Sequence, residues 1–282
     1  MKCAWQAYLN VLPHWMREDV DKYGRNNLQE LHIRIGMQPE MICKNQRHML
    51  SKYAVKDDII FIINAASRYS PWSAGTIANG YITATGGHRI GVCGHATVSE
   101  NGMCGISHPS SVCIRVARDF DSIAKGATDI YGSILIIGPP GSGKTTLLRD
   151  LIRCKSETSN GNISVVDERE EIFPFFNGQA CFYPGRHTDI LSGCSKSEGI
   201  YAVLRSMNPE YIAVDEITSA IDCEALLHAG WCGVHLLATA HAGSICDLKS
   251  RSVYKPLMDK NLFTTVITLR RDKTWIVERI NG

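Results

Sequence analysis

The sequence is poor in the features that mark membrane, secreted and nucleic-acid-binding proteins. No apolar run approaches the 18 residues that a transmembrane helix needs; the best, such as residues 233–240, have the length of a strand. The first ten residues lack the apolar core and cleavage site of a signal peptide. The net charge is only +2, which disfavours a dedicated, sequence-independent nucleic-acid binder. We therefore expect a cytoplasmic protein with no membrane span of its own and no nucleic acid as partner.

The 11 cysteines lack the spacing of a zinc or disulfide framework. No two of them form C-x-x-C, and even neighbours such as Cys223 and Cys232 are nine residues apart. Their number is odd, and the expected compartment is reducing. Most lie in apolar contexts, as in Val92-Cys93, Val112-Cys113 and Ala180-Cys181. The prediction is that the cysteines pack in the core as small hydrophobes and hold no zinc.

The most informative motif lies at residues 138–145, Gly-Pro-Pro-Gly-Ser-Gly-Lys-Thr, which fits G-x-x-x-x-G-K-[ST]. An apolar run precedes it and helix-compatible residues follow it. Its glycines let backbone N–H groups turn around phosphate oxygens, toward which the following helix points its positive N-terminus. Lys144 is predicted to reach the β- and γ-phosphates, and the Thr145 hydroxyl to ligate Mg²⁺. The predicted nucleotide-binding residues are Gly138, Pro139, Pro140, Gly141, Ser142, Gly143, Lys144, Thr145 and Thr146.

Two later apolar strands end in acidic pairs. Residues 211–214 lead into Asp215-Glu216, and residues 162–166 lead into Asp167-Glu168. In a P-loop fold such strands are parallel, and their carboxyl ends face the phosphates. Asp215 is predicted to hold the hydrated Mg²⁺, and Glu216 to polarise the attacking water as general base. Glu168 could orient water or the metal shell; otherwise the acidic pair contacts the nearby Arg169 or caps the next element.

A third apolar strand, 236–240, ends in small polar residues and a histidine. The corresponding strand of a P-loop sheet ends beside the γ-phosphate, so Thr239 or His241 is a candidate sensor of hydrolysis. A lone histidine at a strand end is otherwise more often structural. These strands predict an α/β fold, with a P-loop NTPase domain of the RecA/AAA type at 128–282 and ATP and Mg²⁺ as cofactors.

The preceding residues, 1–127, predict a small N-terminal α+β domain. Its signals are an alternating strand at 31–35, an amphipathic helix at 59–69 closed by Pro71, a hairpin turn at Gly86-Gly87, and a strand at 111–118. Arg115 and Arg118 lie on or beside that last strand. Strand arginines usually form a solvated face; the alternative is an arginine finger supplied to the γ-phosphate of a neighbouring subunit. Spacing does not choose between the two.

Together these motifs resemble the stage III sporulation protein AA family, ATPases similar to type II and type IV secretion ATPases and to AAA-type ring proteins. The residues that carry the resemblance are Leu31–Gly36, Gly86–Gly91, Gly138–Thr145, Val165–Arg169, Ala202–Glu216 and Ala238–His241. The resemblance implies a homo-oligomeric, hexameric ring with ATP between subunits and arginines reaching across. It also implies a place at the inner face of the membrane, held by membrane-embedded channel or export proteins. The chain departs from secretion ATPases in having Asp215-Glu216 where they have Gly-Glu.

Three functions compete on these residues. The first is an oligomeric ATPase motor that powers a membrane channel or export complex during sporulation. The second is a nucleic-acid-associated P-loop ATPase, which the near-neutral charge and the lack of an aromatic-basic surface motif disfavour. The third is a nucleotide-gated binding protein that barely turns over, against which the Asp215-Glu216 pair argues.

Overall fold

The computed structural model describes residues 1–44, 46–67, 80–100, 102–158 and 161–280. The chain divides into two compact units. The N-terminal unit comprises residues 1–119 together with 174–182, and the P-loop unit comprises 120–173 and 183–282. The sequence predicts a boundary near residue 127 and gives no sign that 174–182 returns to the first unit.

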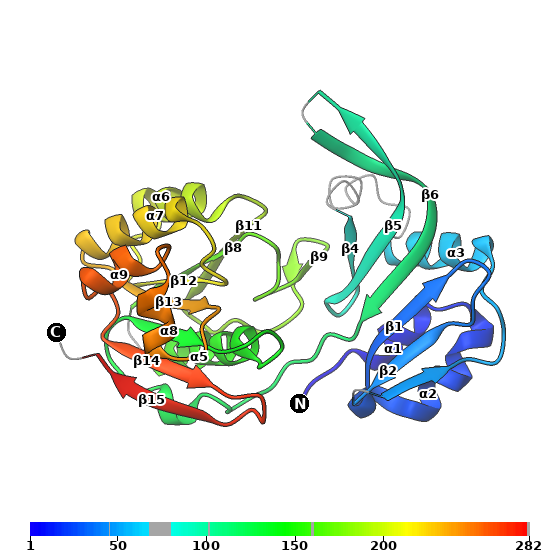
Figure 1. Cartoon of the computed structure of the whole chain (residues 1–282), viewed down its shortest axis with the longest axis horizontal. Coiled ribbons are helices and arrows are strands. Elements are labelled where there is room, and N and C mark those ends of the chain that lie inside the picture. Colours follow the sequence, from blue (N-terminus) through cyan, green and yellow to red (C-terminus); the bar gives the residue numbers. More distant parts are fainter. Residues whose placement is uncertain (45, 68–79, 101, 159–160, 281–282) are drawn as a thin grey trace. The chain divides into compact units, whose positions relative to one another are not determined.

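In its described residues, the N-terminal unit combines three helices with an antiparallel sheet (Figure 1). Its elements are α1 (Trp5–Asn10), α2 (His14–Asn27), β1 (Leu28–Arg34), β2 (Glu40–Cys43), β3 (Gln46–Met49), α3 (Lys56–Ser67), β4 (Tyr81–Ala84), β5 (His88–Ser99) and β6 (Gly102–Arg115). The strand order is β3-β2-β1-β6-β5-β4. Two short strands of the returning segment, β9 (Phe175–Phe176) and β10 (Gln179–Ala180), form a separate pair. The helix end predicted at Pro71 lies outside the described residues.

One face of this sheet forms a core with the three helices. Side chains alternate between faces along a strand, and the inward positions, such as Leu31, Ile33 and Ile114, are fully buried with helix residues of the same cluster. The distal halves of β5 and β6 extend as a two-stranded hairpin (Figure 1) whose residues are mostly exposed.

The same alternation corrects the prediction for the cysteines. Only Cys43 and Cys223 are buried, and four of the others are exposed. Val92 and Val112 face the core, so the residues that follow them, Cys93 and Cys113, lie on the opposite face of the sheet. On a strand with one buried face, a residue next to a buried apolar residue points to the exposed face. An apolar neighbour in sequence therefore does not predict that a cysteine is buried.

The P-loop unit is a mostly parallel sheet flanked by helices (Figure 1). Its elements are η2 (Lys125–Ala127), β7 (Ile134–Ile137), α5 (Lys144–Thr158), β8 (Ile163–Asp167), β11 (Thr188–Ser192), α6 (Lys196–Ser206), β12 (Tyr211–Val214), α7 (Ala220–Trp231), β13 (His235–Ala240), α8 (Ile245–Ser250), α9 (Lys255–Asp259), β14 (Thr265–Leu269) and β15 (Trp275–Arg279). The strand order is β11-β8-β12-β13-β7-β14-β15, and only the β14–β15 pair is antiparallel.

The strands that carry the predicted site are neighbours at the centre of this sheet. Strands β7, β8 and β12 are buried at every position, as expected for parallel strands covered on both faces. Because β8, β12, β13 and β7 run in the same direction, their carboxyl ends lie along one edge. That edge carries residues 138–145, 167–168, 215–216 and 241.

None of the helices in the described ranges has the length and hydropathy that a bilayer crossing requires.

Candidate functional site

The loop at residues 138–145 connects β7 to α5, as the motif predicts. Gly138 leaves the strand where a side chain has no room: a Cβ there would lie 2.8 Å from both the Leu269 carbonyl oxygen and the Ser142 hydroxyl. Gly141 and Gly143 have φ values of 72° and 102°, in the region that favours glycine. Glycine is therefore required at these positions for the loop to adopt its backbone conformation. The loop ends at the N-terminus of α5.

Lys144 is buried and bonded to its own loop. Its Nζ donates to the carbonyl oxygens of Gly138 at 3.0 Å and Pro139 at 3.2 Å, and lies 3.1 Å from Nδ1 of His241. Burial lowers the pKa of Lys144, and the charges of Asp215 and Glu216 oppose that shift. The Lys144 ammonium is therefore held beside the loop, where it would contact an anion bound there.

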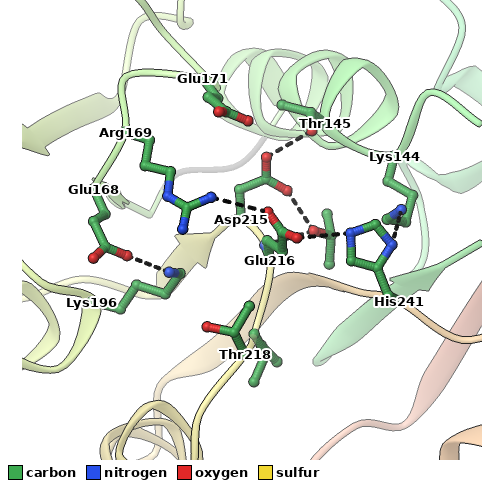
Figure 2. Close-up of polar contacts among 12 residues, drawn as sticks. Lys144, Thr145, Glu168, Arg169, Glu171, Lys196, Asp215, Glu216, Thr218 and His241 are labelled. Atoms are coloured by element: carbon green, nitrogen blue, oxygen red, sulfur yellow. Dashed lines mark hydrogen bonds and ion pairs between the residues drawn. The ribbon is translucent and has the colours of Figure 1, made fainter. Parts of the chain in front are cut away.

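Asp215 is held by two threonine hydroxyls. Thr145 donates to its Oδ2 at 2.7 Å (Figure 2). The buried Thr239 donates to its Oδ1. Burial raises the pKa of Asp215, while both hydroxyl groups act to lower it. The carboxylate follows β12, Thr145 opens α5 and Thr239 lies on β13, so three elements fix one carboxylate beside the loop.

Glu216, His241 and Lys144 form a chain of side chains across the same edge (Figure 2). Nε2 of His241 lies 2.8 Å from Oε1 of Glu216, while Nδ1 faces the Lys144 ammonium. A lysine ammonium can only donate, so Nδ1 accepts and Nε2 carries the proton that Glu216 receives as a hydrogen bond. Glu216 adopts a φ of 53°, and its backbone N–H donates to the Thr239 hydroxyl at 2.7 Å.

The pair Asp167-Glu168 makes different contacts from the pair Asp215-Glu216. The buried Asp167 accepts backbone N–H groups of Glu171, Ile172 and Phe173, at 2.9, 3.0 and 2.8 Å. Burial raises its pKa to about 6, although these hydrogen bonds oppose the shift. Asp167 thus shapes the loop that follows β8.

Glu168, the predicted catalytic member of that pair, forms an ion pair with Lys196 (Figure 2). Both line a small cavity whose other side chains include Asp215 and Glu216. Arg169 also lines this cavity and lies 3.7 Å from the Glu216 carboxylate. The structure therefore brings Glu168 to the edge of the site.

Sequence reasoning missed one cation here and gave another a different partner. Arg169 was a possible partner of Asp167-Glu168, and the structure has it 3.7 Å from the Glu216 carboxylate. Lys196 opens α6, 28 residues from Glu168, with no motif to mark it. Thr239 was a candidate sensor of hydrolysis, but the sequence did not predict that its hydroxyl contacts both Asp215 and the backbone of Glu216.

Arg115 and Arg118 lie in the N-terminal unit. Arg118 donates to the Arg25 carbonyl at 2.9 and 2.6 Å and to the Leu28 carbonyl, where α2 passes into β1. Arg115 lies 3.2 Å from Oε1 of Glu30, and 64% of its side chain is exposed. Arg118 thus has a structural role that the sequence did not predict, and Arg115 is the more accessible of the two. Their action in trans stays a prediction.

The residues present fit a nucleotide and a divalent cation. The Ser142 hydroxyl is buried in the loop and has no hydrogen-bond partner among the residues that the structure describes. A Cβ at Gly138 would lie 2.8 Å from this hydroxyl. A buried hydroxyl without a partner, in space that a side chain would fill, matches a cradle for phosphate oxygens. Thr145 and Asp215 offer adjacent hard oxygens of the kind that Mg²⁺ prefers.

A larger depression of about 980 Å³ lies at the opposite edge of the sheet, where β7, β13 and β14 begin. Tyr131, Trp231, His235 and Arg279 line it. Since the P-loop leaves the carboxyl end of β7, this depression is separate from the candidate site.

A family model described as sporulation stage III, protein AA, matches residues 8–280 of the chain. The chain belongs to the stage III sporulation protein AA family. It is 35% identical over 276 residues to the stage III sporulation protein AA of Bacillus subtilis (strain 168), an alignment that covers 93% of this chain and 90% of the relative. The resemblance inferred from the motifs is thereby confirmed.

Solved structures support the fold of this family member. The pilus retraction motor PilT, solved with bound ADP, is 14% identical with a TM-score of 0.65, covering 94% of this chain and 83% of PilT. The ATPase DotB of Legionella pneumophila is 16% identical with a TM-score of 0.56, covering 95% and 80% of the two chains. The prediction of a P-loop α/β fold with an N-terminal α+β domain is confirmed.

Proposed function

We propose that this chain is the ATP-hydrolysing subunit of an oligomeric motor that serves a membrane channel or export complex during sporulation. The observation that carries the proposal is the joined network at one sheet edge: Thr145 and Thr239 on Asp215, and Glu216 linked through His241 to Lys144. A site that only stored nucleotide would need the loop and a metal position. This site also has the Glu216 carboxylate beside the phosphate-binding lysine and His241, which supports a general base for hydrolysis.

Each side chain has a distinct role in this proposal. Backbone N–H groups of the loop and the Lys144 ammonium bind the phosphates. Thr145 and Asp215 would hold Mg²⁺, which when bound neutralises phosphate charge. Glu216 accepts the proton of the attacking water, because its carboxylate is partly exposed and lines the cavity beside Asp215. Glu168 lies nearby as the alternative base.

His241 is suited to report the state of the phosphates. Its two ring nitrogens face the phosphate-binding lysine on one side and the base on the other. A phosphate that draws Nζ of Lys144 away from the Gly138 and Pro139 carbonyls also changes what Nδ1 of His241 accepts. The orientation of Glu216 is then coupled to whether the γ-phosphate is present.

The assembly part of the proposal follows from the family. We expect a homo-oligomeric ring, hexameric by analogy, in which Arg115 or Arg118 reaches the γ-phosphate of a neighbour. We expect the protein in the cytoplasm, peripheral at the inner face of the membrane through membrane-embedded partners, with no nucleic acid required. Similarity to the pilus retraction motor PilT and to the ATPase DotB supports the motor class.

The test is Glu216→Gln, with Glu224→Gln as matched control on the exposed side of α7. The amide keeps the shape but cannot accept the proton, so turnover should fall by on the order of 10²–10⁴-fold while ATP still binds. Steady-state phosphate release and binding of a fluorescent ATP analogue measure the two effects. Unchanged turnover in Glu216→Gln, with loss in Glu168→Gln, would transfer the role of base to Glu168. Loss in neither variant would reject hydrolysis at this site.

A further inference from the structure

Three side chains with metal-binding atoms meet on the polar face of the N-terminal sheet. Glu30 and His32 lie two residues apart on β1 and therefore on the same face. His32 is the register partner of Cys113 on β6. Their neighbours Leu31 and Ile114 are buried on the other face of the sheet. The cluster is thus built on two paired central strands, which hold its geometry more firmly than a loop would.

The separations among the three atoms approach those of zinc ligands. Nε2 of His32 lies 2.9 Å from Oε2 of Glu30 and 3.7 Å from Sγ of Cys113, and the sulfur lies 4.0 Å from the same Glu30 oxygen. A tetrahedral zinc ion with ordinary bond lengths separates such ligand atoms by about 3.4–3.6 Å. Shifts of about half an ångström, within the reach of side-chain torsions, would place an ion at their centre.

A catalytic relay does not explain the same three residues. In a nucleophile–histidine–carboxylate relay, the nucleophile and the acid contact opposite ring nitrogens. Here Glu30 and Cys113 both face Nε2 of His32. The Cys113 thiol is also directed at Oε2 of Glu30, the same oxygen that Nε2 of His32 contacts. The three atoms therefore form a closed triangle, which can also enclose a shared cation once the thiol has lost its proton.

The surrounding charges permit a divalent ion. Arg115 contacts the other oxygen of Glu30, Oε1, at 3.2 Å, which leaves Oε2 facing His32. Arg34 and Arg47 lie 3.6 and 2.7 Å from the Glu40 carboxylate. The carboxylate and a thiolate together balance the two charges of the ion, and its binding transfers one proton from the Cys113 thiol to solvent.

We propose that Glu30, His32 and Cys113 form a zinc-binding site. The mixed sulfur, nitrogen and oxygen set suits Zn²⁺ and not Mg²⁺ or Ca²⁺, which take oxygen ligands. Side chains of His32 and Glu30 are 23% and 29% exposed, so a water molecule or another exchangeable ligand can occupy the fourth position. The bound ion joins β1 to β6 and stabilises the pairing of these strands, because the unfolded chain does not bring the ligands together.

The test uses Co²⁺ as a spectroscopic substitute for Zn²⁺ on the full-length, chelator-treated protein. The wild type should bind one Co²⁺ with tetrahedral ligand-field bands and a thiolate-to-cobalt charge-transfer band, which Zn²⁺ abolishes by displacement. The oxygens of Thr145 and Asp215 cannot produce the thiolate band, so Co²⁺ bound at the nucleotide site would not contribute to it. Thermal unfolding with and without Zn²⁺ gives a second measurement.

Matched variants separate this site from adventitious binding. Cys113→Ser and His32→Gln should each weaken Co²⁺ binding by at least about tenfold, the smallest loss seen even for outer-shell partners of metals. The controls are Cys93→Ser, an exposed cysteine on β5, and Cys232→Ser, whose sulfur lies 3.9 Å from Nδ1 of His228. They should bind like the wild type.

Circular dichroism verifies that each variant is folded. If Cys113→Ser does not fold, the Co²⁺ spectrum of His32→Gln tests the site instead. A wild type without the thiolate band would overturn the proposal, and so would a band that survives in a folded Cys113→Ser or His32→Gln variant. Loss of the band in either control would assign the metal to other cysteines and overturn it equally.

Discussion

Thr239→Val removes a single hydroxyl that serves two residues of the site. The Thr239 oxygen donates to Asp215 and accepts the backbone N–H of Glu216 at 2.7 Å, and the residue is fully buried. Valine fills nearly the same space, so no cavity opens, but the hydroxyl has no substitute. After the change, a buried carboxylate oxygen lacks its donor and a backbone N–H lacks its acceptor.

The expected loss of stability follows from those two groups. A buried polar group left without a partner costs about 1–3 kcal/mol, and a hydrogen bond to a charged group contributes about 1.5–3 kcal/mol. The two terms share one oxygen and are not additive, so we expect the free energy of unfolding to fall by about 2–5 kcal/mol. From a typical stability of about 10 kcal/mol, such a loss leaves most of the protein folded at 25 °C.

The same change should slow turnover. Glu216 holds a φ of 53°, a conformation that costs on the order of 1–3 kcal/mol in a residue other than glycine. Without the Thr239 bond, Glu216 can relax away from the conformation in which we propose that it acts as general base. We expect kcat to fall by about 10–100-fold, which corresponds to about 1.4–2.7 kcal/mol. Binding of ATP should change little, because Lys144 keeps its own contacts.

Denaturant unfolding and phosphate release on the same preparations measure both effects. The control is Thr268→Val on β14, a threonine that is 9% exposed and whose hydroxyl makes one long contact of 3.4 Å with Glu278. It should lose less than about 1.5 kcal/mol and keep its turnover. If Thr239→Val matched this control in both stability and kcat, the hydroxyl would have no organising role and the reasoning would be refuted.

Three further changes test other parts of the structure. Lys144→Ala should abolish ATP binding or turnover, since it removes the buried ammonium that contacts the Gly138 and Pro139 carbonyls; hydrolysis at the wild-type rate would reject the nucleotide site. Mixing Arg115→Ala with Lys144→Ala should restore part of the ATPase activity through mixed interfaces, and no recovery in mixed rings verified by mass would argue against action in trans. Asp167→Asn should flatten the pH dependence of stability measured in urea between about pH 4 and 6. The native pKa of Asp167 is about 6 against the usual 3.8, so the folded wild type binds the extra proton in this range and loses stability as pH rises, by at most about 3 kcal/mol. Equal slopes for wild type and variant would contradict the raised pKa.

Much of the fold could be predicted because its signals are local. The loop at 138–145 identifies itself by eight consecutive residues, and the apolar runs before Asp167 and Asp215 are recognisable as buried strands. Parallel neighbours then require that their carboxyl ends share an edge, which is why the sequence predicts that Thr145, Asp215 and His241 lie near one another.

Other assignments failed or stayed open because their causes are not local. Cys113 follows a valine, but the alternation of a half-buried strand turns it to the opposite face. Asp167 looks like Asp215 in sequence, yet the loop at 171–173 folds back and occupies its carboxylate. Nothing near Arg118 in the sequence foretells that its guanidinium binds the Arg25 carbonyl.

The sequence by itself determined that a P-loop motif, an acidic strand end and a histidine strand end exist in this chain. Each is a short pattern set by backbone conformation and strand periodicity. Only the tertiary structure decided how they connect: Thr145 meets Asp215 across 70 residues, and Lys144 meets His241 across 97. Such contacts depend on which strands are neighbours and how side chains are oriented, so no local pattern encodes them. The grouping of Glu30, His32 and Cys113 arose in the same way, from the register between β1 and β6.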